Sequence, residues 1–256
     1  MKTSSLLSVA LASTLFFTGC NEDKDDKKIT VAQEQMTDTM IPMDNHDDMN
    51  NHMDEMGEIR QYKVTVLNLT VGQPFAPAGI ILHSKAYHAF DIGMPASEGL
   101  EKLAEGGALT DFLGQTANNE EVKATAAGTG LILPGQSETA MIEAKGDAWL
   151  SLAAMLVKTN DGFTGLHDIY LKELEVGQTW VKYAPTFDAG TEANTESAAT
   201  LPGLEGEGFN ATRDDNNIVT IHSGVVTIDD GLVSSGLDNM AKFDNPTAVV
   251  KIERIK

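Results

Sequence analysis

Apolar residues alternate with polar ones in two stretches, and each stretch predicts a β-strand with one buried face. Residues 62–66 (YKVTV) place a tyrosine and two valines in alternation with lysine and threonine. Residues 248–255 (AVVKIERI) place Val250 and Ile252 on one face, opposite a lysine and a glutamate. Both strands are therefore expected to cover a core with one side only.

Residues 147–157 (DAWLSLAAMLV) show a different pattern, because almost every position is apolar. Such a run is typical of a central strand that is covered on both sides. Two shorter strands are expected over residues 218–222 and 225–228, with a serine and a glycine forming a bend between them. Turns rich in glycine and proline separate these segments.

One segment follows the helical period. Ser97 is a suitable N-cap, and an apolar stripe at Leu100, Leu103 and Ala104 ends at a pair of glycines, residues 106–107. A second short helix is expected to carry Leu109, Phe112 and Leu113. Many short strands with only one or two helices in loops predict an all-β fold, an antiparallel β-sandwich formed by residues 59–256.

The first twenty residues have the pattern of a secretion signal. A lysine precedes a short apolar run over residues 6–17, and small residues follow it. The run is too short to span a membrane. The sequence Phe17-Thr18-Gly19-Cys20 resembles the lipobox of bacterial lipoproteins, in which the cysteine becomes the lipid-modified first residue. The resemblance implies that residues 1–19 are a signal peptide and that Asn21 directs the protein to the outer membrane of a Gram-negative bacterium.

Residues 20–58 are predicted to be an unstructured tether. From Asn21 to Glu58 there are 12 acidic residues and three lysines, with almost no apolar periodicity. Thioether sulfur and imidazole are ligands for copper, so a soft-metal site in this tether is an alternative to a plain acidic linker. Its candidate ligands are Met36, Met40, Met43, His46, Met49, His52, Met53 and Met56.

Composition excludes several function classes. The net charge of -20 argues against a nucleic-acid partner, and a single cysteine excludes both a disulfide framework and a cysteine zinc cluster. The common hydrolase, nucleotide and metalloprotease motifs are absent. The remaining histidines are interpreted as isolated structural residues beside strands: His83, His88, His167 and His222.

Two acidic loops carry the candidate metal site. The first covers residues 159–165 (TNDGFTG), after the apolar strand, and the second covers residues 187–194 (FDAGTEAN). Calcium binds six to eight hard oxygen ligands, which glycine-containing turns can bring together. The candidate ligands are Asp161, Asp188 and Glu192, with Asn160 and Asn194 as secondary candidates. Side-chain turns that cap strands are the alternative explanation of the same pattern.

At these loops the chain resembles the spondin N-terminal domain. The resemblance implies a calcium-bound β-sandwich like that of extracellular adhesion proteins, related to sandwich modules that bind phospholipid through calcium. It assigns the metal carboxylates to Asp161, Asp188 and Glu192, although Gly162 stands where animal members have tryptophan and their cysteines are missing. The matching segments are Met155–Leu171 and Phe187–Glu192, with Tyr62–Pro74, Gly93–Glu105, Leu133–Ser137 and His222-Ser223-Gly224.

The sequence therefore predicts a lipid-anchored, extracytoplasmic calcium-binding module that is not an enzyme. Its expected partners are the membrane, through Cys20, and a protein or glycan ligand whose identity stays open. One alternative is an envelope metal-handling lipoprotein that captures copper with its tether. Another is a metal-assisted hydrolase on a sandwich scaffold, with His222 or His167 near the metal.

Overall fold

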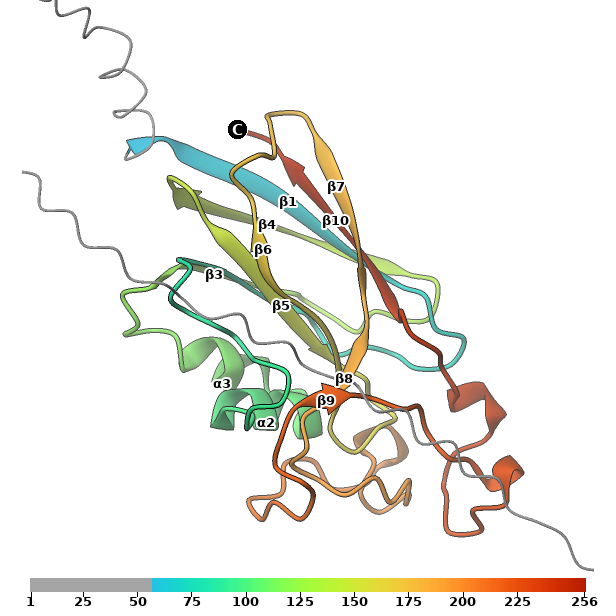
Figure 1. Ribbon diagram of the computed structural model, residues 1–256. Coiled ribbons are helices and arrows are strands. Elements are labelled where there is room, and N and C mark those ends of the chain that lie inside the picture. The colour runs from blue at the N-terminus through green and yellow to red at the C-terminus, as the bar shows by residue number, and fades with distance from the viewer. Residues whose placement is uncertain (1–56) are drawn as a thin grey trace, which may run out of the picture. The chain divides into compact units, whose positions relative to one another are not determined.

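Two antiparallel sheets face each other in the computed structural model, which describes residues 57–256 (Figure 1). The first sheet has the strand order β4 (Ser137–Lys145), β1 (Ile59–Asn68), β10 (Ala248–Arg254), β7 (Thr179–Ala184). The second has the order β3 (Val122–Ala127), β2 (Gly79–His83), β5 (Trp149–Met155), β6 (Gly162–Tyr170), β8 (Thr186–Asp188), β9 (Thr220–Ile221). The predicted all-β sandwich is confirmed.

The main core lies between the two sheets. Alternate residues of β1, including Tyr62 and Val64, meet Leu150 and Leu152 of β5 there. Val250 and Ile252 of β10 belong to the same core, as the sequence pattern predicts. Burial of these apolar side chains is the main force that holds the sheets together.

The helices cover the outer face of the second sheet. α2 (Glu98–Gly106) and α3 (Leu109–Gly114) pack on it, so that Ala153 of β5 joins Leu100 and Phe112 in a second buried cluster. The predicted strand with two covered faces is confirmed. Ser97 accepts a hydrogen bond from the Leu100 backbone N–H, and Gly107 ends α2 in a left-handed conformation, so both predicted helix ends are confirmed as well.

The strand predictions near residue 222 are partly wrong. Only Thr220 and Ile221 are paired, forming β9. The strand expected over residues 225–228 is absent: Gly224 turns the chain at a φ of 95°, and a 3-10 helix covers Ile228–Asp230. A local run of β-branched residues does not supply the neighbouring strand that a sheet requires.

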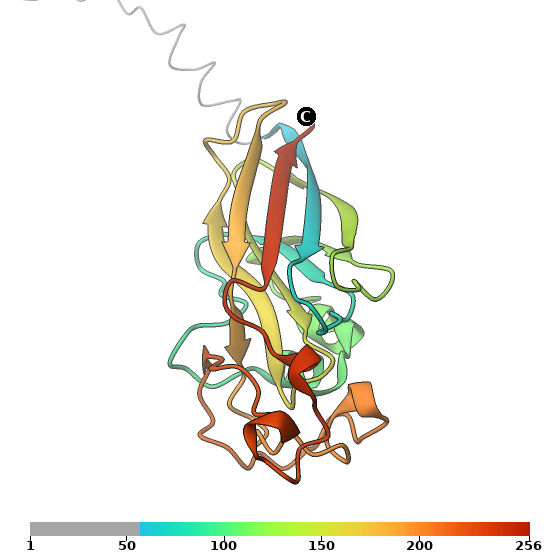
Figure 2. The same cartoon turned by 90° about the vertical axis from the view of Figure 1, so that its right-hand side faces the viewer.

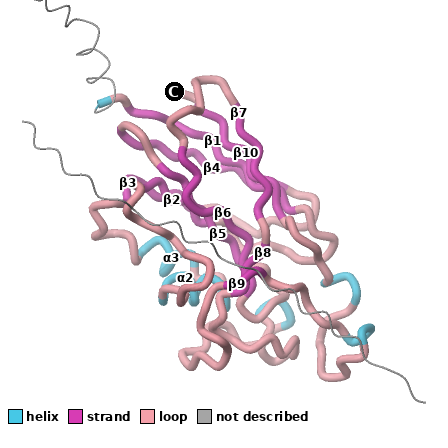
Figure 3. The backbone as a smooth tube through the Cα atoms, viewed as in Figure 1, coloured by secondary structure: helices cyan, strands magenta, loops and turns pink. Residues whose placement is uncertain are grey.

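Loops gather at one end of the sandwich, and both ends of the described chain lie at the other (Figures 1 and 2). The loop end holds the long connections after β8 and β9, including the 3-10 helices Pro202–Leu204 and Asn239–Ala241. At the opposite end, Arg254 lies 3.2 Å from the Glu58 carboxylate, and the Gln61 backbone N–H donates to the carbonyl of Lys256. Figure 3 shows how little of the loop end is helix or strand.

Candidate metal centre at the loop end

The structure brings together the carboxylates that the acidic loops predict. Asp161 directly precedes β6 and Asp188 ends β8, and the two strands pair so that Gly162 lies opposite Asp188. Glu192 follows in the loop after β8. Asp161 is fully buried, and Asp188 and Glu192 are each only 6% exposed. Ionised carboxyl groups are costly to bury, so their grouping calls for a compensating charge or for bound protons.

Only one of the two carboxylate oxygens of Asp161 accepts hydrogen bonds. Its Oδ2 accepts hydrogen bonds from the backbone N–H groups of Thr191, at 2.7 Å, and Glu192, at 3.2 Å. Its Oδ1 is buried and has no hydrogen-bond partner. The loop after β8 thus holds Asp161 in place through one oxygen and leaves the other free to bind a ligand.

The secondary candidates have different roles. The Asn194 amide donates to Asp188 Oδ2 at 2.6 Å, and the Gly190 N–H donates to Asp188 Oδ1 at 2.8 Å. Asn160 instead joins two loop segments, because it donates to the Thr200 hydroxyl and accepts from the backbone of Glu196. Asn194 contacts the Asp188 carboxylate, whereas Asn160 both joins the loops and hydrogen-bonds to the Glu192 side chain.

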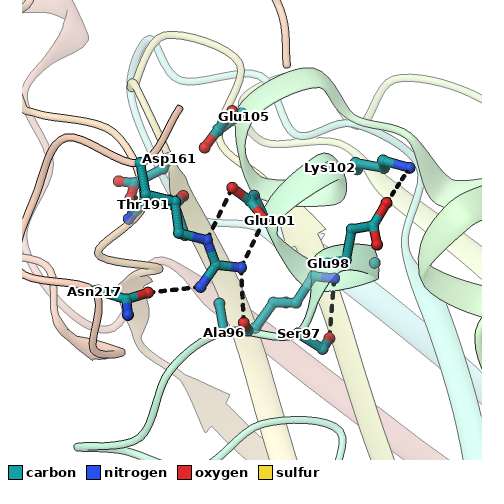
Figure 4. Close-up of polar contacts among 12 residues, drawn as sticks. Ala96, Ser97, Glu98, Glu101, Lys102, Glu105, Asp161, Thr191 and Asn217 are labelled. Atoms are coloured by element: carbon teal, nitrogen blue, oxygen red, sulfur yellow. Dashed lines mark hydrogen bonds and ion pairs between the residues drawn. The ribbon is translucent and has the colours of Figure 1, made fainter. Parts of the chain in front are cut away.

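Two further carboxylates belong to this cluster, and sequence reasoning missed both. Glu105 of α2 is fully buried beside Asp161 and Thr191 (Figure 4), and its Oε1 has no hydrogen-bond partner. Glu196 is 2% exposed and accepts from the Val226 backbone N–H at 3.1 Å. Glu105 lies in the last turn of α2, where the helix dipole disfavours a negative charge. A glutamate there is the one local signal that could have identified it.

These five residues, Asp161, Asp188, Glu192, Glu105 and Glu196, are called the acidic cluster below. Within residues 57–256 none of them forms an ion pair with lysine or arginine. Arg213 instead binds Glu101 of α2, at 2.6 and 3.0 Å, together with the Ala96 carbonyl and Asn217 (Figure 4). Among the described residues, the negative charge of the acidic cluster is therefore offset only weakly, by the charge of Arg213 acting on Glu105.

Burial and mutual repulsion change the acidity of the cluster. Burial raises the pKa of Glu192 to about 8, with further contributions from the charges of Glu105, Asp161 and Asp214. Burial, followed by the charge of Asp188, raises the pKa of Asp161 to about 7. Burial also raises the pKa of Glu105 and of Glu196. Near neutral pH the cluster therefore retains protons unless a cation replaces them.

His222 lies at the edge of the acidic cluster. Its Nδ1 accepts a hydrogen bond from the Gly224 N–H at 3.0 Å, and its buried Nε2 has no hydrogen-bond partner. Burial lowers its pKa, although the charge of Asp188 opposes that shift. Because Nδ1 is an acceptor, the neutral ring carries its hydrogen on Nε2. In this tautomer Nε2 has no lone pair with which to accept a proton or coordinate a metal.

The other three described histidines, His83, His88 and His167, lie close together. All three rings approach the carboxylate of Asp168 in β6. Among the described residues, the one group of three His, Cys, Asp or Glu side chains whose ligand atoms all lie within 4.8 Å of one another is His88, Asp91 and Asp168. The carboxylates of Asp161, Asp188 and Glu192 are not drawn together as closely.

Several predicted residues lie outside the described part of the chain. These are Cys20, the signal peptide and the methionines and histidines of the tether, from Met36 to Met56. Within the described part, no helix has the length and apolar character needed to cross a bilayer.

Comparisons with known proteins complete this description. Neither the protein-family models nor the curated proteins compared with the chain give a match. The resemblance to the spondin N-terminal domain therefore stays a prediction, and the functional argument depends on the geometry of the site.

Proposed function

We propose that residues 59–256 form a calcium-binding module of the bacterial cell envelope that binds a protein or glycan and does not act as an enzyme. The observation that carries the proposal is the acidic cluster: five buried carboxyl groups that form no ion pair with a lysine or arginine of the described residues 57–256. Three of their oxygens are buried and have no hydrogen-bond partner, namely Asp161 Oδ1, Glu192 Oε2 and Glu105 Oε1. Buried polar atoms without partners are rare in proteins unless a ligand satisfies them.

The donor set suits calcium. Every unsatisfied group of the cluster is a carboxylate oxygen, and calcium prefers hard oxygen ligands in flexible arrangements of six to eight. The nearest histidine, His222, offers no lone pair at Nε2, which argues against a transition metal at this place. Binding of the ion would draw the Glu192 and Asp161 oxygens together and would order the loop that follows β8.

The position of the cluster supports a role in binding. It lies at the loop end of the sandwich, opposite the end where the described chain begins at residue 57 (Figure 2). A lipid on Cys20 would be joined to the described domain through residue 57, at the end away from the acidic cluster. Labelling with radioactive palmitate checks the anchor, since the label should be lost in Cys20→Ala. An unlabelled wild-type protein would contradict the anchor.

The calcium site is tested by thermal unfolding of the full chain in excess chelator and in millimolar calcium. Calcium should raise the Tm of the wild type, because an ion that binds only the native state adds RT ln(1 + [L]/Kd), or about 2.7 kcal/mol at a hundredfold excess over Kd. Asp161→Asn removes one charge without a change of shape and should abolish most of this shift. Asp215→Asn, at an exposed position of a neighbouring loop, should retain it.

Equal Tm values in chelator and in calcium would contradict the site. The same conclusion would follow if Asp161→Asn and Asp215→Asn responded alike. Turnover of glycan or ester substrates by the purified protein would contradict the non-enzymatic part of the proposal, and the histidine tautomer described above is the reason to expect none.

A further inference from the structure

A bulge between β5 and β6 brings the side chains of two adjacent residues, His167 and Asp168, close together. Leu150 pairs with Ile169 and Leu152 pairs with Leu166, so Ser151 alone lies opposite both His167 and Asp168. Adjacent residues of a regular strand point to opposite faces, but a bulge re-aims one of them. Asp168 has a φ of 56°, uncommon for a residue other than glycine, and its side chain lies beside that of His167.

Three potential ligand atoms, from His88, Asp91 and Asp168, lie within 4.8 Å of one another at this bulge, and His167 lies beside Asp168. His88 Nδ1 lies 2.7 Å from Asp168 Oδ2, and His167 Nδ1 lies 3.5 Å from the same oxygen. Asp91 Oδ1 lies 3.6 Å from His88 Nδ1. Ligand atoms bound to one zinc ion at about 2.1 Å in tetrahedral geometry are about 3.4 Å apart. The spacings among His88, Asp91 and Asp168 are therefore close to those of a single ion's coordination shell, whereas His167 lies outside this group of three.

Two atoms beside these ligand atoms are unsatisfied. His167 Nδ1 and Asp168 Oδ1 are both buried and have no hydrogen-bond partner. His88 and Asp91 are exposed, so an ion can reach the group from solvent and water can complete its coordination. The shortest contact, between His88 and Asp168, is the contact that a metal would replace.

His83 supports the group from the interior. Its Nδ1 donates to the Ser84 carbonyl at 2.7 Å, so its Nε2 accepts from the Ser151 hydroxyl at 2.9 Å. The Ser151 oxygen in turn accepts from the Asp168 backbone N–H at 3.1 Å. Since the Nε2 lone pair of His83 is already used, His83 is a positioning residue that holds the bulge and does not serve as a ligand.

We infer that His88, Asp91 and Asp168 form a binding site for a divalent transition-metal ion of the zinc class, with the His167 ring beside it. An imidazole with two carboxylates matches the ligand preference of zinc and its neighbours, whereas calcium prefers an all-oxygen shell. The site is separate from the acidic cluster and does not depend on the calcium proposal.

Titration calorimetry with zinc tests this site in the full chain. His46→Ala and His52→Ala remove the imidazoles of the tether from competition, and Asp161→Asn measures any zinc bound at the acidic cluster. One zinc ion should bind per chain in this background. His88→Gln and Asp168→Asn should each weaken binding at least tenfold, while Asp161→Asn should leave it unchanged. Asparagine tolerates the left-handed conformation of residue 168, so that variant retains its backbone.

Two results would overturn the inference. The first is the absence of saturable zinc binding in the background protein, and the second is zinc affinity unchanged in both His88→Gln and Asp168→Asn. If Asp168→Asn fails to fold, Asp91→Asn replaces it, because Asp91 is an exposed residue of the loop before α2. Unchanged affinity in His88→Gln and Asp91→Asn would overturn the inference equally.

Discussion

At the level of single residues, the site depends on carboxyl groups that the protein buries without neutralising them. Glu192 shows the cost most clearly, because burial raises its pKa to about 8. A proton or a cation must occupy such a group for the folded state to tolerate it. Stability, pH and calcium are therefore expected to be linked at this residue.

We expect the calcium-free protein to lose stability as the pH rises from about 6.5 to about 8. In this range an unfolded glutamate is ionised, with a pKa of about 4.3, while Glu192 in the folded state still holds its proton. The folded state binds more protons, so the free energy of unfolding falls as the pH rises. The buried histidines with lowered pKa, His83 and His222, act with the opposite sign, but only below about pH 6.5.

Urea unfolding in chelator at several pH values measures this slope. Glu192→Gln should make it shallower, and Glu120→Gln, at an exposed position, should leave it as in the wild type. A wild-type protein that gains stability over this range, or a slope that Glu192→Gln does not change, would count against the burial argument.

Gly190 fixes the turn between Asp188 and Glu192. Its φ is 71°, and an added Cβ would lie 2.3 Å from the Ile218 backbone oxygen. We expect Gly190→Ala to lower the free energy of unfolding by about 3 kcal/mol, combining left-handed strain with a backbone clash. Gly93→Ala is the matched control, because Gly93 has a φ of 84° but open space around it. It should cost only about 1 kcal/mol, and equal losses in the two variants would show that the close approach at Gly190 is unimportant.

At the level of elements, the long loop after β8 is attached to α2 by one ion pair. Arg213 binds Glu101, whose side chain is 6% exposed. We expect Arg213→Gln to cost about 3 kcal/mol in urea unfolding, because it leaves a buried carboxylate without its partner. Lys102→Gln breaks pairs with the more exposed Glu98 and Asp111 and should cost much less than Arg213→Gln. Similar losses in the two variants would contradict the special role of the Arg213 pair.

The elements that could be predicted from sequence are those whose pattern of apolar and polar residues shows directly which faces are buried. Residues 147–157 are apolar on both faces because β5 lies between the main core and the helices. β2 could not be predicted, since its five residues are all buried and neither alternation nor length separates such a run from a short helix. The strand expected over residues 225–228 was wrong because Val226 is exposed and no strand is available to pair with it.

At the level of the whole molecule, the candidate site combines segments that are far apart in the sequence. Asp161, Asp188 and Glu192 could be predicted because each lies in an acidic loop at a strand end. Glu105 could not, because its place in the cluster depends on the packing of α2 against the second sheet, which brings together residues far apart in the sequence. The convergence of His83, His88 and His167 on Asp168 likewise depends on the β5–β6 bulge. No pattern of residues in the sequence predicts that bulge.

The central claim is a calcium ion held between Asp161, Asp188 and Glu192, and a crystal structure in millimolar calcium tests it most directly. The account predicts an ion within about 2.3–2.6 Å of oxygens from these three side chains, and its loss in crystals of Asp161→Asn. An otherwise identical structure in which this position stays without an ion, with the carboxyl groups hydrogen-bonded to one another, would contradict the account.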